Sequence, residues 1–181
     1  MLDFCFEDER TVAFIDGPNL FASCREAGIS IDYKKLLSLF TESAKFIRAY
    51  YYTAIPDGEE YSPIRPLADF LSYNGYSMVT KTMKTMTNHE TGQTRTKGNM
   101  DIEIAVDMLQ ISDKVDHIVL FSGDGDFRYL VEQIQKKAVR VTVVSYKSVI
   151  ADELRRQADT YIDLSTIREQ ISRPPQEHAP A

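Results

Sequence analysis

Apolar and polar positions along the chain predict short strands that alternate with helices. Compact apolar or alternating runs predict strands at 11–15, 45–54, 76–86, 117–121 and 139–145, with a shorter sixth strand at 161–164. Helical spacing follows the turn after the first strand and recurs at 33–40, 62–73, 99–112, 127–137 and 149–157. Residues 87–96 show neither period and predict a loop.

Strands that alternate with helices of this length indicate βαβ units and right-handed crossovers. We therefore predict an α/β fold, a three-layer sandwich around a mostly parallel sheet. The chain has 181 residues and is 43% hydrophobic, which suits one domain with a substantial core. We place an N-terminal extension at 1–9, the domain at 10–171 and a disordered, proline-rich tail at 172–181.

Composition and charge narrow the classes of function. The net charge of −6 argues mildly against a protein whose main task is coating nucleic acid. Two cysteines form no disulfide framework, the N-terminus is acidic, and no apolar run approaches the roughly 20 residues of a membrane span. We therefore expect a cytoplasmic protein with no membrane partner, and a homodimer would be the commonest assembly if it oligomerises.

Carboxylates follow two of the predicted strands. Asp16 ends the first strand, and Asp124 and Asp126 follow the fourth. In a parallel sheet, ligands bind beyond the carboxyl ends of the strands where the strand order reverses, so these acids are expected to share one crevice if the two strands are neighbours. Each acid taken alone is more simply explained as a turn or helix-cap residue, but two acidic turns at one edge favour a site.

A fourth acid lies on the apolar face of the helix predicted at 99–112. At 100° per residue, Asp101 falls in the middle of that face and points at the sheet. An inward carboxylate is costly unless it is paired, bound to a metal or satisfied by the free N–H groups of the first helical turn. Glu103 and Asp107 lie on the opposite side, which indicates a solvated face, although Asp107 could support the site indirectly.

Several carboxylates with no neighbouring His or Cys favour hard cations, Mg²⁺ or Mn²⁺ over Zn²⁺. A basic stretch, 81–97, leads into the helix of Asp101. Lys97 lies four residues before Asp101 and could hold a phosphate beside the metal. An ordinary solvated loop explains these lysines equally well.

Three motifs resemble one known family. FIDGPNLF at 14–21, KGNMDIEIAVDML at 97–109 and LFSGDGDFRYLV at 120–131 are similar to the NYN domain, in the LabA-like branch of the PIN-like nuclease superfamily. The resemblance spans about residues 10–165. It implies a PIN-like sheet with strand order about 3-2-1-4-5, a carboxylate pocket for Mg²⁺ or Mn²⁺, and hydrolysis of RNA phosphodiester bonds.

The resemblance also assigns residues to the site. By their match to the family motifs, the acids are Asp16, Asp101, Asp124 and Asp126, with Asn19, Lys97 and Ser122 beside them. The chain departs from the family at Ala138, where a glycine usually precedes the fifth strand.

Our hypothesis from the sequence is a metal-dependent ribonuclease that acts on single-stranded RNA. The four acids would hold one or two divalent ions, and Asn19 and Ser122 would orient the carboxylates. The alternative is a non-catalytic RNA- or nucleotide-binding module that regulates through a protein partner, because a fold alone does not establish turnover.

Overall fold

The computed structural model describes residues 7–56, 64–87 and 94–174, which form a seven-stranded sheet in the order β4-β3-β2-β1-β5-β6-β7. Neighbouring strands are parallel except β3 and β4, which are antiparallel. The strands are β1 (Arg10–Asp16), β2 (Lys45–Pro56), β3 (Tyr76–Thr87), β4 (Thr94–Lys97), β5 (His117–Phe121), β6 (Arg140–Ser145) and β7 (Thr160–Asp163). The predicted strands correspond to β1, β2, β3, β5, β6 and β7, so the expected order 3-2-1-4-5 is confirmed.

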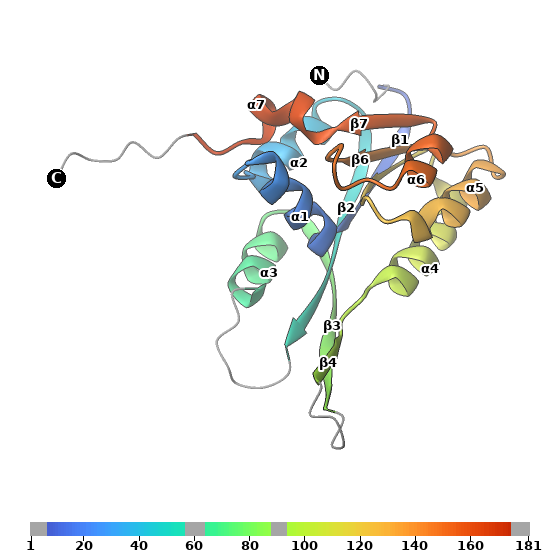
Figure 1. The fold of residues 1–181 in the computed structure, drawn as a ribbon. Helices are drawn as coiled ribbons and strands as arrows, with labels where there is room; N and C mark the ends of the chain where they lie inside the picture. Colours follow the sequence, from blue (N-terminus) through green and yellow to red (C-terminus); the bar gives the residue numbers. More distant parts are fainter. Residues whose placement is uncertain (1–6, 57–63, 88–93, 175–181) are drawn as a thin grey trace.

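Helices cover both faces of the sheet, as the three-layer prediction requires (Figure 1). One face carries α1 (Gly17–Ala27), α2 (Tyr33–Thr41), α3 (Ile64–Tyr73) and α7 (Arg168–Ile171). The other carries α4 (Asp101–Ile111), α5 (Arg128–Gln135) and α6 (Asp152–Gln157). Alternate residues of β1 serve the two layers: Ala13 and Ile15 pack on the first, and Val12 and Phe14 on the second.

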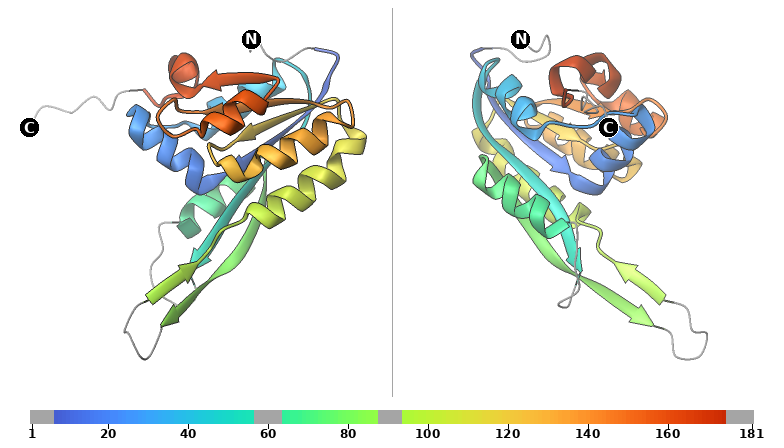
Figure 2. Two further views of the ribbon diagram at one scale, coloured as in Figure 1. Left: turned by 45° about the vertical axis from the view of Figure 1, so that its right-hand side comes forward. Right: turned by 90° about the vertical axis from the view of Figure 1, so that its left-hand side faces the viewer.

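The predicted loop at 87–96 is partly wrong. Thr87 completes β3, and Thr94–Lys97 forms β4, whose residues pair with 84–87. Four residues are too short for a period to stand out, and all four of these are polar, so the pairing partner rather than the local pattern creates the strand. The remainder, 88–93, lies outside the described residues. Together, β4 and the end of β3 extend beyond the helical layers as an arm (Figure 2).

The C-terminal boundary also differs from the prediction. Ser172 forms an isolated bridge with Ile31, and the Arg173 amide donates to the Ser30 carbonyl oxygen at 2.8 Å. The Arg173 Nε donates to the carbonyl oxygen of Ile31 at 3.0 Å. These two residues of the predicted tail therefore pack against the loop after α1, and 175–181 lies outside the described residues. Within the described ranges, no helix is long and apolar enough to cross a membrane.

The turn after α5 contains the residue that departs from the family pattern. Ala138 has a φ of 61°, in the left-handed region, where its Cβ costs about 1 kcal/mol. Glycine removes this strain. Part of the gain in stability is lost, because glycine also gives the unfolded chain more conformational freedom. We expect Ala138→Gly to raise the free energy of unfolding by about 0.5 kcal/mol, measured by urea denaturation. Ala68→Gly, inside α3, should instead lower it by about 1 kcal/mol; a loss in both variants would contradict the assignment of strain to Ala138.

A buried histidine at the amino end of β5 predicts a pH dependence of stability. Burial, reinforced by the positive charge of Arg140, lowers the pKa of His117 to about 3. Its Nε2 lies 2.8 Å from the Thr142 hydroxyl. Its Nδ1 lies 3.2 Å from an Arg140 nitrogen and 3.6 Å from a Glu9 carboxylate oxygen. The imidazole therefore stays neutral in the folded protein at pH values where the unfolded chain, with a histidine pKa near 6.5, takes up a proton.

The unfolded state thus binds more protons between pH 6.5 and 3, and the contribution of His117 to stability is full above 6.5 and falls as the pH drops through this window. We expect wild-type stability to decline more steeply than that of His117→Gln, by at most about 1 kcal/mol per pH unit. Urea denaturation of both proteins from pH 7 to 4 measures the difference, and equal slopes would show that His117 is protonated in the fold.

Candidate active site

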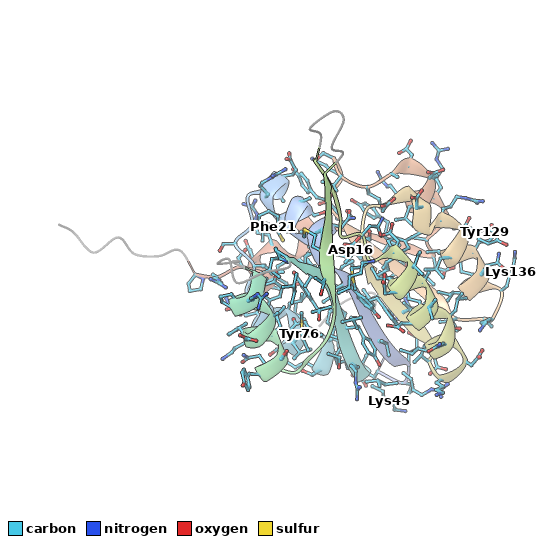
Figure 3. All side chains as sticks on the ribbon, turned by 90° about the horizontal axis from the view of Figure 1, so that it is seen from below. Asp16, Phe21, Lys45, Tyr76, Tyr129 and Lys136 are labelled. Carbon is cyan, nitrogen blue, oxygen red and sulfur yellow. The ribbon has the colours of Figure 1, made fainter. Side chains whose placement is uncertain are left out.

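The candidate site lies beyond the carboxyl ends of the central strands. Asp16 is the last residue of β1, and Ser122 directly follows β5, the strand paired in parallel with β1. Figure 3 looks onto this edge of the sheet and shows Asp16 near its middle. The strand order places β1 and β5 side by side with their crossovers on opposite faces, which is the reversal point where α/β sheets bind ligands.

Asp16 is buried, with 5% of its surface exposed, and its carboxylate is held by two neighbours. Its Oδ2 accepts hydrogen bonds from the Asn19 side-chain nitrogen at 2.8 Å and from the Ser122 hydroxyl at 3.1 Å. Its Oδ1 accepts from the Asn19 amide at 3.3 Å and so caps α1. The Asn19 Oδ1 in turn accepts from the Gly123 amide at 3.1 Å, which ties α1 to the loop after β5.

The sequence around Asp16 explains why α1 begins there. A Cβ at Gly17 would lie 2.7 Å from the backbone oxygen of Tyr52 and 2.7 Å from the Tyr51 ring, so the chain approaches β2 more closely than other residues allow. Pro18 follows in the first turn of the helix, where its missing N–H is not needed.

The loop after β5 presents two acids. The Ser122 hydroxyl oxygen accepts from the Asp124 amide at 3.2 Å, and the Asp124 carboxylate accepts from the Asp126 amide at 3.0 Å. Asp124 thereby caps a short 3-10 helix at 125–127, which Phe127 anchors in the core. Asp124 is half-buried and Asp126 is exposed, so both remain open to a ligand.

The fourth acid, Asp101, lies on α4. Ile104 and Met108 bury the inner face of this helix, as its spacing predicts, and Asp101 begins it. The Asp101 amide donates to Asn99 Oδ1 at 2.7 Å, and its carboxylate accepts a hydrogen bond from the Asn99 side-chain nitrogen. Oxygens of Asp101, Asp124 and Asp126 lie within 4.8 Å of one another. We call these three residues the acidic cluster; Asp16 lies beside it and not within it.

Burial and mutual repulsion raise the pKa of two of the acids. Burial raises the pKa of Asp101, and the negative charges of Asp124 and Asp126 raise it further, while Asn99 and Lys81 act against this shift. Burial likewise raises the pKa of Asp16, opposed by its hydrogen bonds from Asn19 and Ser122 and reinforced by the charge of Asp101. A cation among these groups would relieve the repulsion.

Two further contacts fix α4 to the sheet, and they correct the expected solvated face. Glu103 accepts hydrogen bonds from Lys81 Nζ on β3 at 3.0 Å, and Asp107 accepts one from the Tyr52 hydroxyl on β2 at 2.8 Å. Asp107 is therefore bonded to the sheet and is not part of the acidic cluster. The exposed side of α4 carries the apolar residues Ile102, Val106 and Leu109.

These three apolar residues are spaced by four and three positions, and this spacing in the sequence could have indicated that the helix carries apolar residues on both sides. In the sequence Lys81 is only one residue of a basic stretch, and its ion pair with Glu103 depends on the packing of α4 over β3, which local sequence does not reveal. For Lys97, the structure describes only the backbone, opposite Lys84 in the β3–β4 pair. Its predicted contact with a phosphate stays a prediction.

Comparisons with known proteins agree with the fold and with the family resemblance. Residues 10–165 match the NYN domain. The chain is 37% identical to "Low amplitude and bright protein LabA" of Synechococcus elongatus, over 93% of this chain and 90% of that protein. A crystal structure of a Vibrio parahaemolyticus protein of unknown function superposes with a TM-score of 0.69 at 26% identity, over 91% of this chain and 96% of that one. The resemblance drawn from the three motifs is confirmed, and the chain belongs to the NYN-domain family.

Proposed function

We propose that the protein hydrolyses RNA phosphodiester bonds with the help of a divalent metal ion bound at the acidic cluster. The observation that carries the proposal is the convergence of Asp101, Asp124 and Asp126, from two separate segments, with oxygens within 4.8 Å of one another. NYN domains are typically nucleases of the PIN-like superfamily, and family membership supports an RNA-related role.

The donor set fits Mg²⁺ or Mn²⁺. Among the described residues, the cluster offers carboxylate oxygens, which are the donors that hard cations prefer. It contains neither His nor Cys. Asp101, Asp124 and Asp126 would hold the ion, and Asp16 would add a carboxylate beside it. When bound, such an ion lowers the pKa of a coordinated water and neutralises charge on a phosphate.

The surrounding residues keep these carboxylates in place. Asn19 and Ser122 bind the Asp16 carboxylate, and Ser122 also accepts from the amide of Asp124, so one hydroxyl aligns acids from both strands. Asn99 orients Asp101. Lys81 brings positive charge near Asp101 while it is bonded to Glu103, and we assign Lys97 a phosphate contact at the same edge.

Asp107 acts indirectly in this proposal. Its hydrogen bond to Tyr52 and the Lys81–Glu103 pair join α4 to two adjacent strands, one helical turn apart. These bonds hold the helix that carries Asp101 over the strand ends. The substrate we propose is single-stranded RNA, because a flexible strand can follow an open crevice more readily than a duplex can.

Cleavage of end-labelled RNA tests the proposal. Single-stranded and duplex forms of one sequence are incubated with the protein in Mn²⁺, Mg²⁺ or a chelator. We expect metal-dependent cutting of the single strand and slower cutting of the duplex. RNA binding without cutting under every condition would instead favour the regulatory binding module, with which the net charge of −6 is compatible. Light scattering of the same preparation tests the expected homodimer.

A further inference from the structure

A cavity of about 520 Å³ opens along one flank of α1, between the helix and the loop that follows it. The loop after α1 and the segment at Arg173 complete its walls. Six of the residues that line it are Phe21, Arg25, Ser30, Ile31, Tyr33 and Arg173. We call it the α1 cavity. No residue of the acidic cluster lines it, so it is a separate feature of the surface.

Phe21 is the unusual residue of this cavity. Leu20, Cys24 and Ala27 bury the inner side of α1, whereas Phe21 leaves 65% of its surface exposed. A large apolar ring held in solvent is informative when it borders a cavity. Figure 3 shows Phe21 on the same edge of the molecule as Asp16. At 1.5 Å per residue, the two residues are about 7.5 Å apart along the helix axis.

Positive charge accompanies the aromatic ring. The Arg173 side chain is held in place, because its Nε donates to the Ile31 carbonyl oxygen at 3.0 Å and its backbone amide donates to Ser30. Arg25 lies 3.7 Å from Glu26, but both side chains are exposed, so solvent screens that pair and leaves the guanidinium able to bind an anion. Among the described residues that line the cavity, none is acidic. The cavity is therefore a basic pocket on an acidic protein.

An exposed aromatic ring beside two guanidinium groups matches the chemistry of a nucleotide in a single strand. Bases stack on aromatic side chains whatever their sequence, and Arg binds phosphate by paired hydrogen bonds. We propose that the α1 cavity binds a nucleotide of single-stranded RNA next to the segment at the acidic cluster. The base stacks on Phe21, and its phosphate contacts Arg25 and Arg173. The choice of RNA as ligand rests on the proposed function.

RNA binding measured without cleavage tests this site. Fluorescence anisotropy of a labelled single-stranded oligonucleotide, in chelator, is followed for wild type, Phe21→Ala and Phe21→Tyr. Loss of one stacked base is expected to weaken binding about tenfold in Phe21→Ala, and tyrosine should restore it. Tyr129→Ala is the matched control, because Tyr129 is 63% exposed on α5 and lies far from Phe21 in Figure 3. Thermal melts establish that all variants are folded.

The charge contribution has its own readout. Affinity falls as salt rises, and Arg25→Gln should make the slope of log affinity against log salt shallower by about 0.7, the value for one phosphate of a single strand. Lys136→Gln, which changes an exposed cation distant in Figure 3, should leave the slope unchanged. Equal binding by wild type and Phe21→Ala, or a wild type that binds no RNA, would overturn the proposal; the first result would leave Phe21 to contact a protein.

These outcomes separate the two proposals. If wild type cuts RNA but Phe21→Ala binds it as tightly as Tyr129→Ala does, the α1 cavity proposal fails and the nuclease proposal stands. If Phe21→Ala loses binding while wild type cuts nothing, the nuclease proposal fails and the cavity stands. In an active enzyme, Phe21→Ala should raise KM about tenfold with little change in kcat, since the ring contacts only substrate outside the reacting centre.

Discussion

Replacing Asp124 with Asn is expected to lower metal-dependent RNA cleavage by about 10³-fold, which corresponds to about 4 kcal/mol of transition-state stabilisation. The substitution keeps the size of the side chain and the oxygen that accepts the Asp126 amide, so the cap of the 3-10 helix can survive. It removes one negative charge from the acidic cluster, and with it a ligand for the metal. Single-turnover cleavage with saturating Mn²⁺ measures the loss.

Asp113→Asn is the control for Asp124→Asn. Asp113 is an exposed acid that pairs with Lys137 at 3.0 Å, just beyond the carboxyl end of α4 and away from Asp101 at its start. Asp113→Asn changes the net charge by the same amount as Asp124→Asn, and this variant should cleave RNA as fast as wild type. Equal cutting by wild type and Asp124→Asn would place the activity elsewhere, either in another site or in a contaminant.

Asn19→Ala is expected to reduce Mn²⁺ affinity and cleavage by about 10- to 100-fold, the usual effect of removing a residue that orients a metal ligand. Asn19 donates to the Asp16 carboxylate at 2.8 Å and accepts from the Gly123 amide at 3.1 Å. Alanine loses both bonds, which frees the buried carboxylate and the loop that carries Asp124. Calorimetric titration with Mn²⁺ and the cleavage assay each report the effect.

Asn74→Ala provides the comparison for Asn19→Ala. Asn74 also bonds the backbone through its side chain, to the carbonyl oxygen of Phe70, but it lies between α3 and the start of β3, at the edge of the sheet opposite the site. Asn74→Ala should lower the free energy of unfolding and leave the Mn²⁺ affinity as in wild type. If both variants lose affinity to the same degree, the effect of Asn19 would be a general loss of stability and not the orientation of Asp16.

The strands were predictable from sequence where burial imposes a pattern. β1 and β5 lie in the middle of the sheet with both faces covered, so each is a continuous apolar run. Their order could not come from such runs; it followed from the family motifs. β4 was missed because its four polar residues carry no pattern and exist as a strand through pairing with β3. The small helix α7 was missed for a similar reason, since one turn gives no period.

The acids of the site were predictable because parallel strands end at one edge. What sequence could not supply was their relative placement. Asp101, Asp124 and Asp126 converge, while Asp16 is set beside them by Asn19 and Ser122. Long-range contacts decided the rest: the partners of Glu103 and Asp107 come from strands more than twenty residues away. The α1 cavity had no sequence signal, because Arg173 is brought to it by backbone pairing of 172–173 with the loop after α1, a contact between distant parts of the chain.

The central claim is that the ion required for RNA cleavage is the one bound by the acidic cluster. The most direct test measures Mn²⁺ binding by calorimetry and Mn²⁺ dependence of cleavage on one preparation of wild type and Asp124→Asn. We predict that one Mn²⁺ concentration half-saturates both curves in wild type and that both curves shift together or vanish in Asp124→Asn. Cleavage that persists in chelator, or a wild type that binds Mn²⁺ without cutting RNA, would contradict the account.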